Sequence, residues 1–222
     1  MTENNKEAQM RELAAQLSCP SGELGVKTAE MMSQTNSNMI SCTIDALGLK
    51  NNDDVLEIGP GSGCHVVDVI HRASGISYIG VDTSELMVAE ALRNNPKLVD
   101  SGHASFQLSD GEIISFPDGN FDKVFSVNTI YFWSDPKSYA AEIFRILKRG
   151  GLLTLGFATR DFMEKLPFTS YIFTLYRLGE VEELLKAAGF EIQSVDELQE
   201  KVTSNSGESV ERTFFVLKAG KF

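Results

Sequence analysis

A glycine-rich turn directly after a short apolar segment constrains the fold of this chain more than any other feature. Residues 55–63 read VLEIGPGSG, which is typical of a buried strand that passes through a tight turn into a helix. Gly59, Gly61 and Gly63 allow the turn and the close approach of a ligand, and the N–H groups of the following helix can bind an anion. The GxGxG spacing differs from the GxGxxG fingerprint of nicotinamide-dependent dehydrogenases, which disfavours an oxidoreductase.

An acidic residue ends the next apolar segment. Asp82 follows residues 78–81, about 20 residues after the glycines, where a carboxylate can accept hydrogen bonds from both hydroxyls of a ribose. The alternative is a helix N-cap before TSELM, a role that Thr83 or Ser84 can share. We favour the ribose role because the glycine turn and the acid occur together in this order.

Strand and helix patterns alternate along most of the chain, which predicts parallel βαβ units. Strands are expected at residues 55–58, 78–81, 105–108, 123–127, 152–157, 190–195 and 213–217. No helical pattern separates the last two, so the final strand is expected to be antiparallel.

The predicted fold is therefore an α/β, Rossmann-like, doubly wound and mostly parallel seven-stranded sheet, with the last strand antiparallel and an N-terminal helical cap. Residues 1–50 are expected to form the cap, and residues 51–222 the Rossmann-like domain, with a short lid insert at about residues 158–178.

Charge and cysteine content narrow the function classes. Asp and Glu total 31 against 20 Lys and Arg, a formal charge of −11, and such a surface repels a phosphate backbone. Cys19, Cys42 and Cys64 are odd in number and lack CxxC spacing, which argues against disulfides and a zinc site. The start of the sequence lacks the apolar core of a signal peptide, and no segment reaches about 20 apolar residues. We expect a cytoplasmic protein with no nucleic-acid, membrane or metal partner.

Four ordered segments carry a family resemblance: VLEIGPGSG, GVDTSELM, SDGEIISFPDGNFDKVFSVNTIYFW and ILKRGGLLTLGF. Together they resemble class I S-adenosylmethionine-dependent methyltransferases, particularly the small-molecule branch of ubiquinone- and menaquinone-biosynthesis-type enzymes. The similarity covers residues 53–195. It implies an enzyme that binds S-adenosyl-L-methionine and methylates an oxygen, nitrogen or carbon of a small, apolar or aromatic acceptor, as a monomer or a homodimer.

The resemblance also implies a set of ten cofactor-binding residues. In chain order they are Glu57, Gly59, Gly61, Gly63, Asp82, Thr83, Met87, Asp110, Gly111 and Asn128. The methionine end would be held by Glu57, Gly59, Gly61 and Gly63, and the ribose by Asp82. The adenine would be contacted by Thr83, Met87, Asp110 and Gly111, and the transferred methyl group would be faced by Asn128. Met87 could instead be a core residue, and Asp110 with Gly111 could form only a turn.

The acceptor side is less defined. Tyr131 and Trp133 follow the fourth strand, where the resemblance implies a segment that faces the substrate. The histidine pair usual in the family is absent there, which favours an apolar or aromatic pocket. Methyl transfer from a sulfonium needs positioning more than a metal or a dedicated base, so the catalytic residue stays unassigned. His65 and Tyr131 are the candidates, each with a structural role as the alternative.

Two other functions stay open. The chain could modify protein or RNA, although Asn128 is followed by Thr129 and Ile130 and not by an NPPY-type signature. It could also be a module that binds the cofactor without turnover, because this family places little of its catalysis on a single side chain.

Overall fold

The computed structural model describes residues 3–203 and 209–222, and its seven described strands form one sheet in the order β3-β2-β1-β4-β5-β7-β6. The strands are β1 (Asp54–Ile58), β2 (Ser77–Asp82), β3 (Ala104–Leu108), β4 (Phe121–Val127), β5 (Leu147–Ala158), β6 (Glu191–Thr203) and β7 (Ser209–Gly220). The first five pair in parallel, whereas β7 runs antiparallel to both β5 and β6. The predicted fold, including the antiparallel last strand, is confirmed.

Strands β6 and β7 extend several residues beyond their predicted ends. They pair continuously from Glu191 opposite Gly220 to Thr203 opposite Ser209, apart from one register shift. Most of β6 is exposed or half-buried, so its outer half has no strong apolar alternation to read. Pairing with β7, and not a local sequence pattern, extends this strand.

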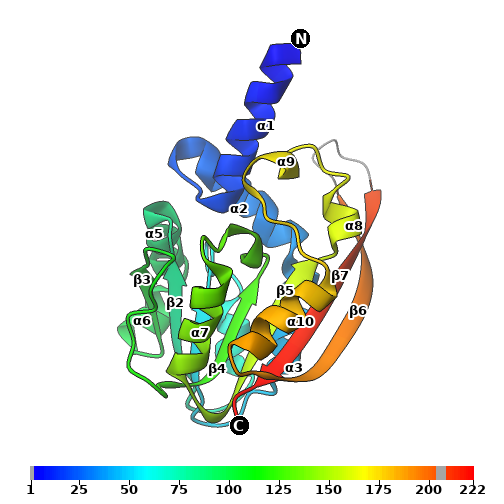
Figure 1. Cartoon of the computed structure of the whole chain (residues 1–222). Coiled ribbons are helices and arrows are strands. Elements are labelled where there is room, and N and C mark those ends of the chain that lie inside the picture. Colours follow the sequence, from blue (N-terminus) through cyan, green and yellow to red (C-terminus); the bar gives the residue numbers. More distant parts are fainter. Residues whose placement is uncertain (1–2, 204–208) are drawn as a thin grey trace.

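Helices cover both faces of the sheet (Figure 1). They are α1 (Glu3–Ser18), α2 (Gly22–Thr35), α3 (Ser37–Leu47), α4 (Val66–His71), α5 (Glu85–Asn94), α6 (Pro96–Asp100), η1 (Ile130–Phe132), α7 (Pro136–Ile146), α8 (Arg160–Met163), α9 (Thr169–Ile172) and α10 (Leu178–Ala187). Asp135 caps α7 by accepting from the backbone N–H groups of Lys137 and Ser138 at 3.1 Å, as its sequence predicts. No helix within the described ranges has the length and apolarity needed to cross a bilayer.

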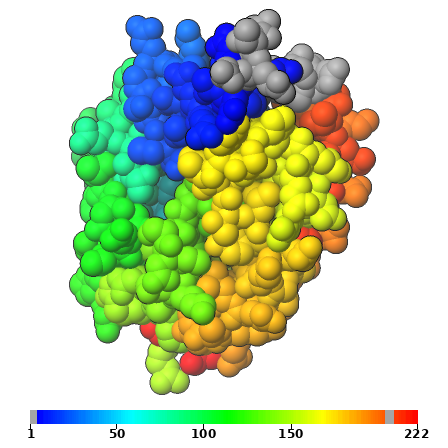
Figure 2. Space-filling model, turned by 45° about the horizontal axis from the view of Figure 1, so that its top comes forward, coloured from blue at the N-terminus to red at the C-terminus, as the bar shows by residue number. Residues whose placement is uncertain are grey.

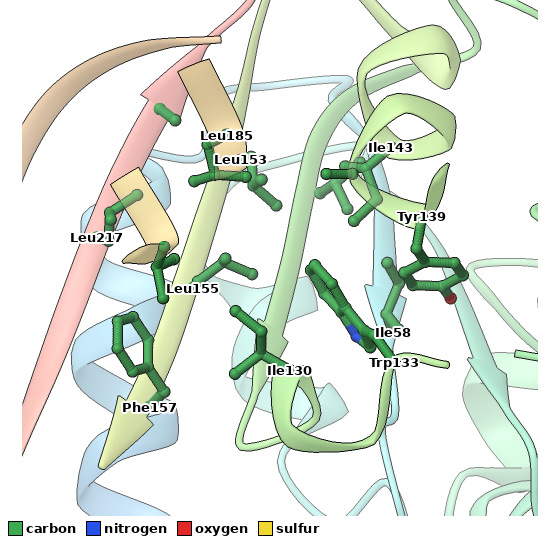
Figure 3. Packing of buried hydrophobic residues seen from close by; sticks show 14 of the residues in the cluster. Ile58, Ile130, Trp133, Tyr139, Ile143, Leu153, Leu155, Phe157, Leu185 and Leu217 are labelled. Atoms are coloured by element: carbon green, nitrogen blue, oxygen red, sulfur yellow. The ribbon is translucent and has the colours of Figure 1, made fainter. Parts of the chain in front are cut away.

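Neighbouring residues of the central strands point to opposite apolar cores. Leu56 of β1 joins the larger core, which α7 and α10 cover, while Val55 joins a second core beneath α3, α4 and α5. Figure 3 shows the larger core, where Leu153 and Leu155 of β5 face Ile143 of α7 and Leu185 of α10. Packing on both faces fixes the strands between the two layers of helices, and it therefore fixes the positions of their carboxyl ends.

The three N-terminal helices pack in two different places. Helix α3 packs against β4, β5 and β7, and Gly156 makes room for it because a Cβ there would collide with Thr43. Helices α1 and α2 lie over the carboxyl ends of the strands, where α1 meets α9 of the insert (Figure 1). The Arg11 guanidinium sits 5.0 Å from the centre of the Tyr171 ring. Two segments that are distant in sequence therefore cover one edge of the sheet.

Candidate active site

A cavity of about 380 Å³ lies at the carboxyl ends of β1, β2 and β4, beneath α2. This volume lies in the range of about 300–1,000 Å³ that small-molecule sites occupy. In Figure 2 a recess separates the blue N-terminal helices from the green segments below them. Nine of the ten residues expected to bind the cofactor line this cavity, Gly63 being the exception. The fold thus gathers residues from position 57 to position 128 around one space.

The glycines after β1 have different local surroundings. Gly59 and Gly61 have φ values of +76° and +56°, in the left-handed region that favours glycine. A Cβ on Gly59 would collide with Thr129, whereas a Cβ on Gly61 would meet nothing within 4 Å. Gly63 lies against Ala91 and Asn95, each 3.1 Å from its Cβ position. Gly61 therefore borders open space, and Gly63 allows close packing against α5.

The Asp82 carboxylate closes the turn from the side of β2. Its oxygens accept hydrogen bonds from the backbone N–H of Gly61 at 3.1 Å and of Ser84 at 2.9 Å. Burial raises the pKa of Asp82, and these hydrogen bonds oppose that shift only in part. Ser84 caps α5, because its hydroxyl accepts from the Met87 N–H at 3.1 Å. The cap and the cavity-facing carboxylate are thus two separate residues.

Glu57 lies in the wall of the cavity, and both of its carboxylate oxygens have hydrogen-bond partners. The Nε2 atom of His65 lies 2.8 and 2.9 Å from its two carboxylate oxygens, and the hydroxyl of Tyr78 donates to it at 2.5 Å. Burial opposes protonation of His65, but the charge of Glu57 and the hydrogen bond to it outweigh burial and raise the His65 pKa. The Nε2 atom of His65 is thus held by Glu57, and a role of His65 as a general base stays a prediction.

The loop after β3 supplies another wall. Asp110 accepts from the backbone N–H groups of Glu112 at 2.8 Å and Ile113 at 2.9 Å, and these bonds lower its pKa. Asp110 therefore does form a turn, and it also lines the cavity together with Gly111 and Thr83. Met87 likewise belongs to both the apolar core and the cavity wall, since its side chain is 1% exposed and borders the cavity. A structural role and a place in the cavity wall coexist at these positions.

Asn128 lies just beyond β4 in a left-handed conformation, with φ +58°. Its Oδ1 accepts from the backbone N–H of Ala158 at 3.3 Å, and its Nδ2 donates to Oδ1 of Asn36 at 3.2 Å. Both amide ends are thereby fixed against the cavity that Asn128 lines.

The two aromatic residues expected to face the substrate lie in different places. Tyr131 is buried and is not among the cavity-lining residues, and its hydroxyl donates to the Ala158 carbonyl at 3.1 Å. Burial raises the pKa of this hydroxyl. Trp133 does line the cavity, 5.0 Å from the ring of Tyr139, and Figure 3 shows it beside Ile58. Its buried indole N–H has no hydrogen-bond partner within the described ranges.

Phe132 and Met32 also line the cavity. Phe132 belongs to the aromatic run of Tyr131 and Trp133, and Met32 to the N-terminal helices. Three further cavity residues carried no clear signal in the sequence: Asn36, Ser109 and Tyr139. Asn36 could not have been found, because it lies between two helices and reaches the cavity only through the packing of α2 and α3.

Comparisons with known proteins agree on one family. The model of the family described as "Methyltransferase domain" matches residues 56–155. The chain is 31% identical over 164 residues to the uncharacterized methyltransferase YdaC of Bacillus subtilis, covering 72% of this chain and 84% of that protein. It is 28% identical to the demethylmenaquinone methyltransferase of Beutenbergia cavernae, covering 72% of this chain and 62% of that enzyme.

A solved structure with a similar fold is a methyltransferase from Haloferax volcanii, determined in complex with the Trm112 methyltransferase activator. It superposes with a TM-score of 0.70 at 19% identity, over 86% of this chain and 92% of that chain. At this level of identity the likeness concerns the fold alone.

Proposed function

This chain belongs to the class I S-adenosylmethionine-dependent methyltransferases, and from this premise we propose that it methylates an oxygen, nitrogen or carbon of a small, apolar or aromatic molecule. Membership of the family makes it an enzyme whose methyl donor is S-adenosyl-L-methionine. The donor carries an electrophilic methyl group on a sulfonium, so the protein has mainly to bind, orient and exclude water.

The residues around the cavity suit this cofactor. The open backbone at Gly61 lets a ligand approach closely, and the Asp82 carboxylate beside it can accept hydrogen bonds from a diol. The unpartnered N–H of Trp133 is a buried donor that a bound molecule could satisfy. A polar end, a carboxylate and an aromatic wall within one cavity match a nucleoside with an amino-acid tail.

We assign roles on this basis. Glu57, Gly59 and Gly61 would hold the methionine end, and Asp82 the ribose. The adenine would lie against the segment formed by Thr83, Met87, Asp110 and Gly111. Asn128 would face the methyl group, and Gly63 would act through the packing of α5 and not by direct contact.

The nature of the wall supports an apolar or aromatic acceptor. The cap contributes Met32 and Ile40, and the segment after β4 contributes Phe132 and Trp133. Among the described residues that line the cavity there is no arginine or lysine, which favours an acceptor without a phosphate group. The insert that holds α8 and α9 would act as a lid, because α9 meets α1 over this edge of the sheet.

Two measurements test the proposal. Isothermal titration calorimetry with S-adenosylhomocysteine should show saturable binding, and absence of binding would defeat the assignment of the site. Transfer of radiolabelled methyl groups should then be assayed with a naphthoquinol, a simple phenol, total RNA and a protein extract. Label in either small molecule supports the proposed acceptor class. Label only in RNA or protein would overturn it in favour of a macromolecular acceptor, and binding without transfer to any of the four would favour a non-catalytic module.

A further inference from the structure

A buried ion pair joins the C-terminal hairpin to the N-terminal helices. The side chains of Arg212 on β7 and Glu200 on β6 are only 6% and 8% exposed, and their closest atoms, Nη2 and Oε1, are 2.6 Å apart. Burial of two charges is favourable only when the remaining donors and acceptors are also satisfied. Arg212 meets that requirement by donating to Oδ1 of Asn36 and to the carbonyl of Thr35, both at 2.8 Å.

Asn36 transmits this contact to the cavity. Its Oδ1 accepts from Nη1 of Arg212 and, at 3.2 Å, from Nδ2 of Asn128. Rotation of the Asn36 amide by 180° would place an NH₂ group against both donors, so one orientation is imposed. Asn36 and Asn128 both line the cavity, whereas Arg212 does not.

Asn128 is held through both its backbone and its side chain. Its backbone lies in the left-handed region, with φ +58°, which asparagine tolerates better than most other non-glycine residues. Its backbone N–H donates to the Gly156 carbonyl at 2.8 Å, and its side chain is held by Ala158 on one side and Asn36 on the other. The Asn36 contact is itself fixed by a charged donor, which makes a stronger hydrogen bond than a neutral one.

We propose that Arg212 is a positioning residue that sets the affinity for the cofactor, by holding Asn36 and Asn128 in place in the cavity wall. This inference rests on the proposed function, in which Asn128 faces the methyl-bearing end of the cofactor. It assigns a role in ligand binding to the β6–β7 hairpin, whose described residues, 191–203 and 209–220, do not line the cavity. Glu200 contributes indirectly, by holding the guanidinium through Nε and Nη2.

The test measures the Kd of S-adenosylhomocysteine by calorimetry on the full chain. Arg212→Met should weaken binding at least tenfold, and Arg212→Lys should recover only part of the loss, since lysine keeps the charge without the planar fork. Asn36→Ala should weaken binding by a similar factor. It is the variant more certain to fold, because Arg212 then keeps Glu200 and the Thr35 carbonyl. The double variant, Arg212→Met with Asn36→Ala, should have a Kd no higher than that of whichever single variant has the higher Kd.

The control is Lys148→Met, which breaks the ion pairs of Lys148 with Asp54 and Asp122 at the opposite end of the sheet. None of these three residues lines the cavity, so the Kd should not change. If Arg212→Met and Asn36→Ala lower the Tm but bind with the wild-type Kd, Arg212 is only structural and the inference is overturned. Failure of the wild-type chain to bind would instead defeat the proposed function, and this inference with it.

Discussion

The carboxylate of Asp82 and the backbone N–H of Gly61 are hydrogen-bonded at 3.1 Å, which joins the end of β2 to the turn after β1. The two groups come from neighbouring parallel strands, whose register places Ile58 opposite Val81. One ligand can therefore contact the glycine turn and the acid together. This juxtaposition is the geometric basis of the site, and it leads to the first two predictions.

Gly61→Ala should weaken the binding of S-adenosylhomocysteine at least tenfold. Alanine at φ +56° costs about 1–2 kcal/mol of stability, and its methyl group would enter the cavity. Gly48 is a matched control, because its φ is +58° and a Cβ there also meets nothing within 4 Å, but it lies outside the cavity lining. Gly48→Ala should lose similar stability in urea unfolding and leave the Kd unchanged. Equal Kd values for the two variants would contradict a cofactor contact at Gly61.

Asp82→Asn should weaken binding about 10- to 100-fold, since a hydrogen bond to a charged group contributes about 1.5–3 kcal/mol. The free energy of unfolding at pH 7 should also fall, because asparagine has one acceptor oxygen for the two backbone N–H groups of Gly61 and Ser84. Burial, which raises the Asp82 pKa, offsets part of this loss because the neutral amide avoids the cost of a buried charge. Calorimetry and urea unfolding measure the two effects separately. Asp100→Asn, at the exposed end of α6, is the control. A loss of stability without a loss of affinity would show that Asp82 is only structural.

Trp133 should report ligand binding directly. It is the single tryptophan of the sequence and it lines the cavity, so S-adenosylhomocysteine should change the intrinsic fluorescence with the same Kd as calorimetry. Trp133→Phe should abolish the fluorescence signal while heat of binding is still detected. Saturable heat without any fluorescence change in the wild-type chain would place the ligand away from Trp133.

The pair of Glu57 and His65 predicts a dependence of stability on pH. Because the folded-state pKa of His65 is raised, the stabilisation is complete below the unfolded pKa of about 6.5 and is lost as the pH rises through the folded value. The stability difference between the wild type and His65→Gln should therefore be largest near pH 6, about 2 kcal/mol, and shrink toward pH 9. Urea unfolding across this range measures it. In a Glu57→Gln background the pH dependence should reverse, because burial lowers the His65 pKa and is then unopposed by the charge of Glu57. An unchanged dependence there would show that another group is responsible.

Local patterns were sufficient to predict the parallel strands and the residues at the centre of the site. Each strand of the parallel part was recognisable because an apolar segment ends at a glycine or a polar residue, and the ends of parallel strands converge by geometry alone. That is why residues 57–61 and Asp82 were predicted together and are found around one cavity. Their role in cofactor binding stays a prediction until the binding experiments are done.

Two features could not be read from sequence, for different physical reasons. Arg212 and Asn36 are 176 positions apart and meet only through tertiary packing, so neither has a local pattern that marks it. Tyr131 and Phe132 are neighbours within the 3₁₀ turn η1, and only the second lines the cavity. The rotation of each residue about the axis of this turn decides which ring faces the cavity. Three residues are too few to show a periodic pattern in the sequence.

The position of β7 between β5 and β6 has a consequence for biosynthesis. On the ribosome β5 and β6 emerge first, so one edge of β5 keeps its N–H and C=O groups unpaired until β7 has been translated. That edge carries apolar side chains such as Leu155 and Phe157, which the finished fold buries. A nascent chain that stalls before β7, or one that is truncated there by a premature stop codon, would expose this unpaired strand edge. Chaperones would bind such a chain, or it would aggregate.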